Sequence, residues 1–209
     1  MLVSVSGLRR TIPSSKVQVK LLQYKVGHFN PATSLAAAFL GQVEYNTAMY
    51  YSLAQLVGAI TGSLILWIAW FAISPVPTLL GANLPHSDTR WWEGLFVEIV
   101  MSFSFHWVLF QLFARDGDDK LSFTDARILL FGEGSESSGF FAGTALLISN
   151  MMCIAVSGGS MNPARSFGPA VVAGVWKSHW MYWVGPYLGA LFAAYYVQKT
   201  KEEKKEDED

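Results

Sequence analysis

A tripeptide that occurs twice, Asn-Pro-Ala, constrains the fold of this 209-residue chain more than any other feature. It stands at residues 30–32 and again at residues 162–164, each time just before an apolar run. Asparagine is a good N-cap, and proline at the first helical position gives up a backbone N–H that would be unpaired in any case. Each triplet therefore predicts a helix start. The residues concerned are Asn30, Pro31 and Ala32 in the first triplet and Asn162, Pro163 and Ala164 in the second.

Two such helices whose N-termini meet inside a membrane would direct the positive ends of their dipoles at one spot. The side chains of Asn30 and Asn162 would then offer amide donors to whatever passes between them. This arrangement suits a neutral, hydrogen-bonding solute and repels cations, protons included. The repeated triplet thus favours a channel with an inverted internal repeat.

The composition agrees with a membrane protein. Hydrophobic residues make up 52% of the chain and charged residues 15%, and the mean hydropathy is +0.30; this is richer in apolar residues than most soluble domains. Eight Trp and eight Tyr fit the aromatic belts of membrane interfaces. The net charge of −1 creates no overall field toward nucleic acid. Because no Cys/His dyad, metal cluster or phosphate loop is visible, the sequence predicts neither an enzyme nor a metal or other cofactor.

The apolar runs predict an all-α fold with about four full transmembrane helices, because a span needs roughly 20 apolar residues. The first half-helix is expected at residues 33–40, and the full spans at residues 47–73, 91–114, 139–156 and 177–197. Inside the second span lie two ionisable residues, Glu98 and His106. We expect His106 to be a hydrogen-bonded interior histidine, since it has no partner at metal-ligand spacing.

Composition divides the chain into a basic segment at residues 1–26, a channel domain at residues 27–198 and a charge run at residues 199–209. We expect the first to lie on the cytoplasmic surface and the last to be a disordered tail. The loop at residues 115–138 is polar, with a short surface helix expected at residues 121–131. Twelve of the fifteen Lys and Arg residues lie in the basic segment, this loop or the tail. The positive-inside rule therefore places both termini in the cytoplasm.

The stretches from Gly27 to Leu35 and from Ser157 to Gly185 resemble the aquaporins, and the aquaporin-8-like branch in particular. The motifs that carry the resemblance are the paired triplets, Arg165 directly after the second, and the last span from His179 to Pro186. The resemblance implies an aquaporin-like inverted repeat embedded in a lipid bilayer as a homotetramer. It also implies passive transport of water, and it leaves ammonia, hydrogen peroxide and urea open as further solutes.

The resemblance also implies a narrow selectivity ring in the pore. By position, Arg165 is the arginine of that ring, Gly159 its loop residue and Asn150 its fifth-helix residue; the fourth member has no counterpart here. Asn150 departs from the histidine of strict water channels and from the apolar residue typical of the aquaporin-8-like branch. With Gly159 opposite, the ring is expected to be wide and polar.

Other positions match family patterns outside the ring. Glu98 resembles a buried glutamate that braces loop carbonyls in aquaporins, so we expect a structural brace rather than proton chemistry. Four residues match the pattern of water-conducting rather than glycerol-conducting relatives: Ser166, Ala170, Tyr182 and Trp183.

The resemblance breaks before the first triplet. An aquaporin has two full transmembrane helices there, whereas only 29 residues precede Asn30 in this sequence. We therefore expect a truncated isoform or an incomplete gene model. This leaves an alternative function open, that of a non-conducting truncated subunit that associates with full-length aquaporins and regulates them.

Overall fold

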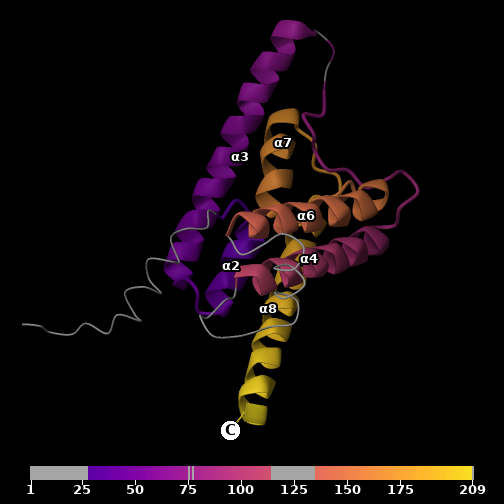
Figure 1. The fold of residues 1–209 in the computed structure, drawn as a ribbon. Coiled ribbons are helices and arrows are strands. Elements are labelled where there is room, and N and C mark those ends of the chain that lie inside the picture. The colour runs from indigo at the N-terminus through magenta and orange to yellow at the C-terminus, as the bar shows by residue number, and fades with distance from the viewer. Residues whose placement is uncertain (1–27, 75, 77, 114–134, 209) are drawn as a thin grey trace, which may run out of the picture.

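The computed structural model describes residues 28–74, 76, 78–113 and 135–208, and every regular element within these ranges is a helix (Figure 1). The helices are α2 (Pro31–Phe39), α3 (Tyr45–Ile73), α4 (Trp91–Phe113), α6 (Ser135–Ser157), α7 (Pro163–Ala173) and α8 (Met181–Glu208). The expected all-α fold is confirmed. The expectations for the basic segment and for a surface helix at residues 121–131 lie outside the described residues.

Three of these helices are long and apolar enough to cross a membrane, over Tyr45–Ile73, Trp91–Leu112 and Gly139–Ser157. They agree with the first three predicted spans. The fourth expected span overlaps α8, which begins at Met181 rather than at residue 177 and is not among the three helices that meet the criterion of length and hydropathy. The chain turns just before it, with Ser178 at a φ of 53°. α8 is less hydropathic than the other three because its first two turns contain Tyr, Trp, Gly and Pro and its last turns are rich in Lys and Glu.

The expectation of a disordered tail at residues 199–209 is wrong, because α8 continues to Glu208. Residues four apart support the helix there: Gln198 Nε2 donates to Glu202 Oε1 at 3.1 Å, and Lys199 Nζ lies 3.7 Å from Glu203 Oε1. Pairs at this spacing lie on one helix face and stabilise it by a few tenths of a kcal/mol, about 0.2–0.5 each.

Helix packing depends on small residues at the crossings. A Cβ atom on Gly185 of α8 would lie 2.6 Å from the Cβ of Glu98 in α4, and one on Gly189 would lie 2.5 Å from the carbonyl oxygen of Ile99. A Cβ atom on Gly168 of α7 would lie 2.4 Å from the carbonyl oxygen of Ala59 in α3. These glycines let α8 lie against α4, and α7 against α3, at backbone distance.

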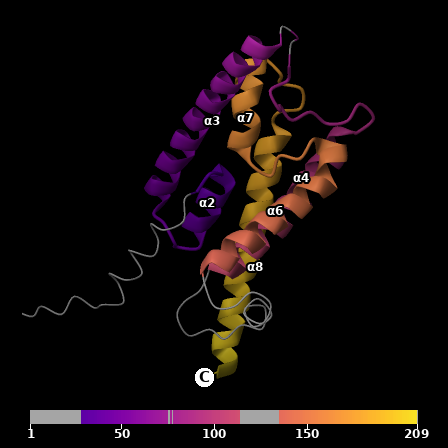
Figure 2. The ribbon, with the colours of Figure 1, turned by 45° about the horizontal axis from the view of Figure 1, so that its top comes forward.

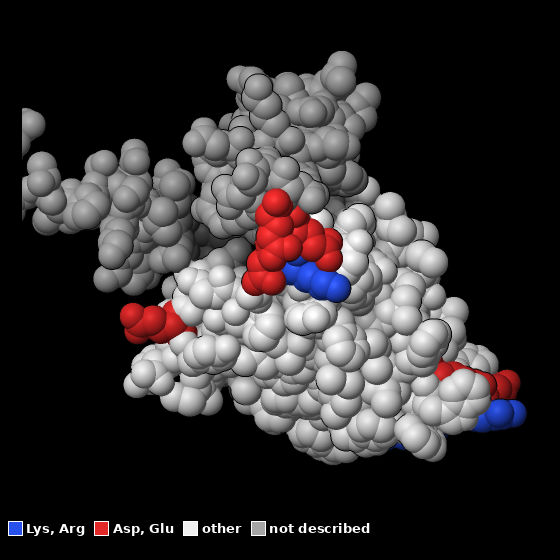
Figure 3. Space-filling model, turned by 90° about the horizontal axis from the view of Figure 1, so that it is seen from below, with Lys and Arg blue, Asp and Glu red and all other residues white. Residues whose placement is uncertain are grey.

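The two short helices lie one after the other along α3, with α2 beside its first half and α7 nearer its end (Figures 1 and 2). α2 also packs against α8, and α6 packs against α4. Where the view from the end at which α8 finishes shows described residues, acidic and basic side chains lie in a few separate groups among uncharged ones (Figure 3).

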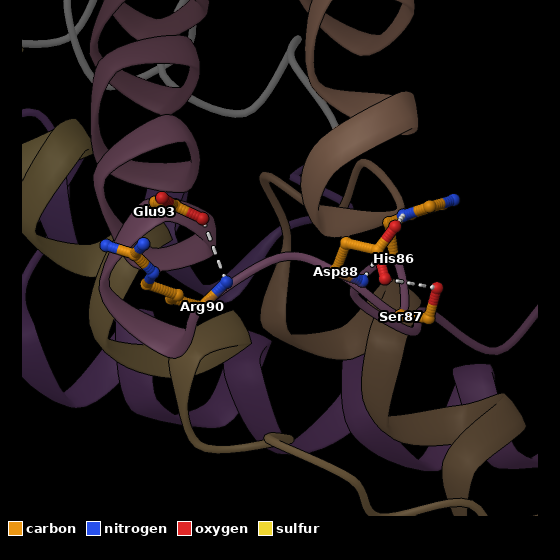
Figure 4. A network of polar contacts seen from close by, with 5 residues as sticks. All are labelled: His86, Ser87, Asp88, Arg90 and Glu93. Atoms are coloured by element: carbon orange, nitrogen blue, oxygen red, sulfur yellow. Dashed lines mark hydrogen bonds and ion pairs between the residues drawn. The ribbon is translucent and has the colours of Figure 1, made fainter.

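The loop before α4 carries an exposed polar network (Figure 4). Arg90 N donates to Glu93 Oε2 at 2.9 Å, which satisfies a free backbone donor at the start of α4. Asp88 N donates to His86 Nδ1 at 3.4 Å, and Ser87 Oγ donates to Asp88 Oδ1 at 3.2 Å. The network shapes the turn by which the chain enters α4.

Candidate functional site

Both triplets start helices in the way the sequence predicts. Asn30 is the N-cap of α2, and its Oδ1 accepts from Ala32 N at 2.9 Å. Asn162 is the N-cap of α7, and its Oδ1 accepts from Ala164 N at 3.0 Å and from Arg165 N at 3.3 Å. Because each carboxamide oxygen is turned back into its own helix, each NH₂ group points outward.

The two asparagines bond across the meeting point of the half-helices. Asn30 Nδ2 donates to the carbonyl oxygen of Met161 at 2.9 Å, and Asn162 Nδ2 donates to the carbonyl oxygen of Phe29 at 3.0 Å. Each asparagine thus bonds the residue that precedes the other one. An NH₂ group carries two hydrogens, so this bond engages one of them. α2 and α7 extend away from this point in opposite directions (Figure 2).

Glu98 of α4 holds the loop that enters the second triplet. Its Oε1 accepts from Ser157 Oγ at 2.6 Å and from Ser160 N at 2.8 Å, and its Oε2 accepts from Met161 N at 2.8 Å. The side chain is fully buried. The contacts are with N–H and hydroxyl donors, not with the loop carbonyls. The carbonyl oxygen of Met161 is in turn the acceptor for Asn30.

Two further side chains bond the same loop. Tyr182 of α8 is fully buried and donates its hydroxyl to the carbonyl oxygen of Ser157 at 2.6 Å. Asn83, from the loop between α3 and α4, donates its Nδ2 to the carbonyl oxygen of Gly158 at 2.6 Å. Its Oδ1 accepts from Ser166 Oγ at 2.7 Å. Elements on three sides therefore fix this loop.

The structure brings two of the three expected ring residues together. Asn150 Nδ2 donates to the carbonyl oxygen of Gly159 at 3.3 Å, and a Cβ atom on Gly159 would lie 3.0 Å from Asn150 Oδ1. Gly159 has a φ of 68°, which also favours glycine. Arg165 is exposed and donates its Nη1 to the carbonyl oxygen of Gly81 at 2.6 Å. The guanidinium is therefore held by the loop between α3 and α4.

The remaining predicted residues lie inside the bundle. Ser166 and Ala170 are buried on α7, and Ser166 Oγ is hydrogen-bonded to Ser160 Oγ. Trp183 packs edge-on against Phe167, with ring centroids 5.6 Å apart. His179, in the turn before α8, lies 6.2 Å from the ring of Phe167, and burial lowers the pKa of its imidazole. These aromatic rings cover the outer end of α7.

Sequence reasoning missed the residues that support the first triplet. Gln55 of α3 donates its Nε2 to the carbonyl oxygen of His28 at 2.7 Å and to Ser34 Oγ at 3.0 Å. A signal was present, because Gln55 is the one strongly polar side chain in an apolar span. The expected interior hydrogen bonding of His106 is confirmed, with Thr33 Oγ1 at 2.9 Å from its Nε2. Nothing in the sequence marked Asn83.

In the described part of the chain, no group of three or more His, Cys, Asp or Glu side chains is placed to hold a metal ion. The polar groups that the structure places at the meeting point of the half-helices are fixed donors. These are two carboxamide NH₂ groups and one guanidinium, arranged around the N-termini of two half-helices.

Comparison with known proteins identifies a family that this chain resembles. A sequence model of the major intrinsic proteins matches residues 21–197. Aquaporin-4 of Homo sapiens is 34% identical over 169 residues, which are 80% of this chain and 47% of that protein. Aquaporin TIP4-4 of Zea mays is 38% identical over 168 residues, covering 80% and 59%. The chain thus spans about half the length of the curated relatives it matches.

Among solved structures, the chain is similar to the aquaglyceroporin of Plasmodium falciparum. The TM-score is 0.62, and the alignment covers 82% of this chain and 72% of that one. The sequence identity is 17%. At this identity the likeness shows a common fold alone.

Proposed function

The chain belongs to the major intrinsic protein family, and we propose on that premise that it is a membrane channel for the passive transport of water and small neutral solutes. The observation that carries the proposal is the reciprocal pair of bonds between the triplets. It leaves two amide donors at the point where two positive helix ends converge.

This arrangement accounts for selection by charge. The oxygen of a water molecule at the meeting point accepts hydrogen bonds from Asn30 and Asn162, so both of its own hydrogens point away from the donors. Cations meet only donors and positive helix ends, and they lose their hydration without compensation. A neutral solute exchanges its bonds with water for bonds with the channel and passes.

We assign the finer selectivity to the ring of Arg165, Gly159 and Asn150. Arg165 supplies fixed positive charge, and its bond to Gly81 supports a constant position for the guanidinium. Asn150 makes one side of the ring polar, and Gly159 leaves the ring wide because it has no side chain. Such a ring favours water and admits ammonia, hydrogen peroxide and urea. The water-type residues are Ser166, Ala170, Tyr182 and Trp183, and Glu98 is the brace.

We further propose that the channel lies in a lipid bilayer as a homotetramer with both termini cytoplasmic. The excess of Lys and Arg at the ends of the chain and in the loop at residues 115–138 supports that orientation.

A second function, that of a regulatory subunit of other aquaporins, is favoured by one observation. Of the residues of α3, all of which the structure describes, Ala48 and Ser63 alone are buried, and Arg165 near α3 is exposed. A guanidinium exposed beside a helix that is itself largely exposed would be costly in hydrocarbon, so this side needs a protein cover if Arg165 is to line a pore. Other copies of the chain would do so in a homotetramer, and full-length aquaporin subunits would do so in a mixed assembly.

Osmotic shrinkage of proteoliposomes, followed by stopped-flow light scattering, tests the proposal. We expect vesicles that contain the chain to shrink at least tenfold faster than protein-free vesicles, because a channel raises the water permeability of the bilayer. The control carries Asn30→Asp and Asn162→Asp, which replace both NH₂ donors by carboxylate oxygens of the same shape. We expect vesicles with this variant to shrink no faster than protein-free vesicles. Inserted protein that shrinks no faster than lipid alone would overturn the channel function. A change in the permeability of a full-length aquaporin reconstituted with it would then support the regulatory function.

A further inference from the structure

The buried imidazole of His106 belongs to no part of the site assigned above. It lies in α4, is 0% exposed, and contacts the rings of Phe105 and Phe110 with centroids 4.8 and 5.9 Å away. Both of its nitrogens are hydrogen-bonded: Nδ1 is 2.7 Å from the carbonyl oxygen of Ser102, and Nε2 is 2.9 Å from Thr33 Oγ1. Thr33 is in the first turn of α2, three residues after Asn30.

The chemistry of the partners fixes which atom donates. A carbonyl oxygen can only accept, so Nδ1 of His106 carries the hydrogen. In the neutral ring Nε2 then has a lone pair, and the Thr33 hydroxyl donates to it. The bond is therefore directional, from the half-helix α2 to the long helix α4.

The other contacts of α2 with α4 and α8 offer little to fix its position along its axis. They are apolar, in a buried cluster of Ala32, Ala36, Phe110, Ala190, Ala193, Ala194 and Val197. Gln55 Nε2 donates to Ser34 Oγ at 3.0 Å, but this bond ties α2 to α3 and not to the helix that holds Met161. Apolar contact is non-directional, and alanine surfaces have shallow ridges, so they resist sliding weakly. A hydrogen bond between fixed atoms sets the position to within a few tenths of an ångström.

α4 also fixes the acceptor that Asn30 must reach. Asn30 Nδ2 donates to the carbonyl oxygen of Met161, and Met161 N is held by Oε2 of Glu98. Glu98 stands two turns before His106 on the same buried side of α4. One rigid helix, α4, therefore holds both partners. Its Glu98 holds Met161, and its His106 holds α2, the helix that follows Asn30.

We propose that His106 is a positioning residue of the channel, which through Thr33 holds Asn30 in register with Met161. The proposal rests on the channel function, because Asn30 is one of the two donors assigned to it. Without the bond, α2 is still tied to α3 through Ser34 but no longer to α4 through Thr33. It can then shift against the alanine surface, and the donor no longer lies opposite Asn162.

Matched substitutions separate the bond from the volume of the side chains. Thr33→Val keeps the shape and removes the donor, whereas Thr33→Ser keeps the donor. His106→Leu removes the acceptor, whereas His106→Gln offers an amide oxygen to Thr33. We expect Thr33→Val and His106→Leu each to lower water permeability per channel about fivefold, with Thr33→Ser and His106→Gln within about twofold of the unaltered chain. The double variant that combines Thr33→Val with His106→Leu should be no worse than either single one.

Solid-state NMR of the protein in bilayers provides a readout that does not depend on conduction. We expect His106 to show a protonated Nδ1 and an unprotonated Nε2, with the Nε2 signal shifted by Thr33→Val and unchanged by Thr33→Ser. The side-chain amide signal of Asn30, assigned with Asn30→Asp, should move in the same variant. The signals of His106 in the unaltered chain test the bond even where a variant does not fold.

Three results would overturn the proposal: a hydrogen on Nε2, an Asn30 signal that is the same in Thr33→Val as in the unaltered chain, or additive losses of permeability. If the unaltered chain does not conduct, the channel function fails, while the NMR signals of His106 and Asn30 still decide whether the contact positions the half-helix.

Discussion

The two triplets carry the same three residues and the same cap, but they are supported by different parts of the molecule. A serine follows each triplet at the same distance, Ser34 after the first and Ser166 after the second. A carboxamide side chain bonds each serine, and it also bonds a carbonyl oxygen upstream of the triplet. Gln55 does so in the first half, from α3, and Asn83 does so in the second, from a loop.

The second triplet has further support that the first does not share among the described residues. Glu98 accepts three hydrogen bonds from the segment that precedes the second triplet, and Tyr182 donates a fourth bond to that segment. The first triplet is tied to α4 through the single bond between Thr33 and His106. The comparison teaches that Asn-Pro-Ala encodes its own helix start, whereas its position depends on side chains far away in the sequence. The second triplet is therefore the more firmly held of the two, and the position of the first depends on its contacts with the elements that hold the second.

The largest effect is expected where the second triplet loses its brace. Glu98→Leu leaves the backbone N–H groups of Ser160 and Met161 buried without an acceptor, and the Ser157 hydroxyl keeps only the carbonyl oxygen of Cys153 at 3.2 Å. We expect the free energy of unfolding to fall by about 3–5 kcal/mol. Denaturant unfolding in detergent measures it. Glu98→Gln keeps one oxygen and should lose roughly half as much. A Glu98→Leu variant as stable as the unaltered chain would show that the two triplets do not differ in support.

A smaller loss is expected where α7 touches α3. Gly168→Ala places a methyl group 2.4 Å from the carbonyl oxygen of Ala59, so α7 must move away, at a cost of about 1–3 kcal/mol in the free energy of unfolding. Gly62→Ala is the matched control, because a Cβ atom there meets nothing within 4 Å. Thermal unfolding of both variants tests the contact. Equal midpoints would contradict the close approach.

The two carboxamides test the comparison directly. Asn83→Leu removes both a donor and an acceptor and should lower the free energy of unfolding by about 2 kcal/mol, whereas Gln55→Leu removes one donor group and should lower it by about 1 kcal/mol. Denaturant unfolding of the two variants side by side gives the difference. If Gln55→Leu proved the more damaging, the first triplet would be the more strongly held one.

The smallest effect is expected from a single hydroxyl. Tyr182→Phe removes the bond to the carbonyl oxygen of Ser157 and should cost about 1 kcal/mol, because the carbonyl stays buried and the ring still packs. Thermal unfolding measures the loss. Water permeability should stay within about twofold of the unaltered chain, since three bonds from Glu98 still hold the loop. A fall to the level of Glu98→Leu would mean that Tyr182, and not Glu98, sets the loop.

The sequence predicted those features that depend on neighbouring residues or on a match to a family motif. The helix starts follow from the residues of each triplet themselves, and the burial of Glu98 follows from its match to a family position. The contacts of Asn83 could not be predicted, since its partners are 75 and 83 residues away and a loop has no periodic pattern. The bond between Thr33 and His106 joins residues 73 apart, so local sequence patterns could not predict it either.

Charge density alone predicts a disordered tail, whereas the order of the charges favours a helix. Lys199 and Glu203 stand four residues apart with opposite signs, and this spacing stabilises a helix even in a segment with no apolar face. The net composition of residues 199–209 is the same whichever order the charges take, so composition alone cannot distinguish a solvated helix from an irregular tail.

The central claim is that the two half-helices meet at their N-termini and extend apart. Spin labels at Phe39, the end of α2, and at Val171, near the end of α7, report this directly in bilayers, on a Cys153→Ala background. Helices of 9 and 11 residues placed end to end predict one narrow distance distribution centred at about 30 Å. A distance below about 15 Å, which requires the two helices to lie side by side, would contradict the account.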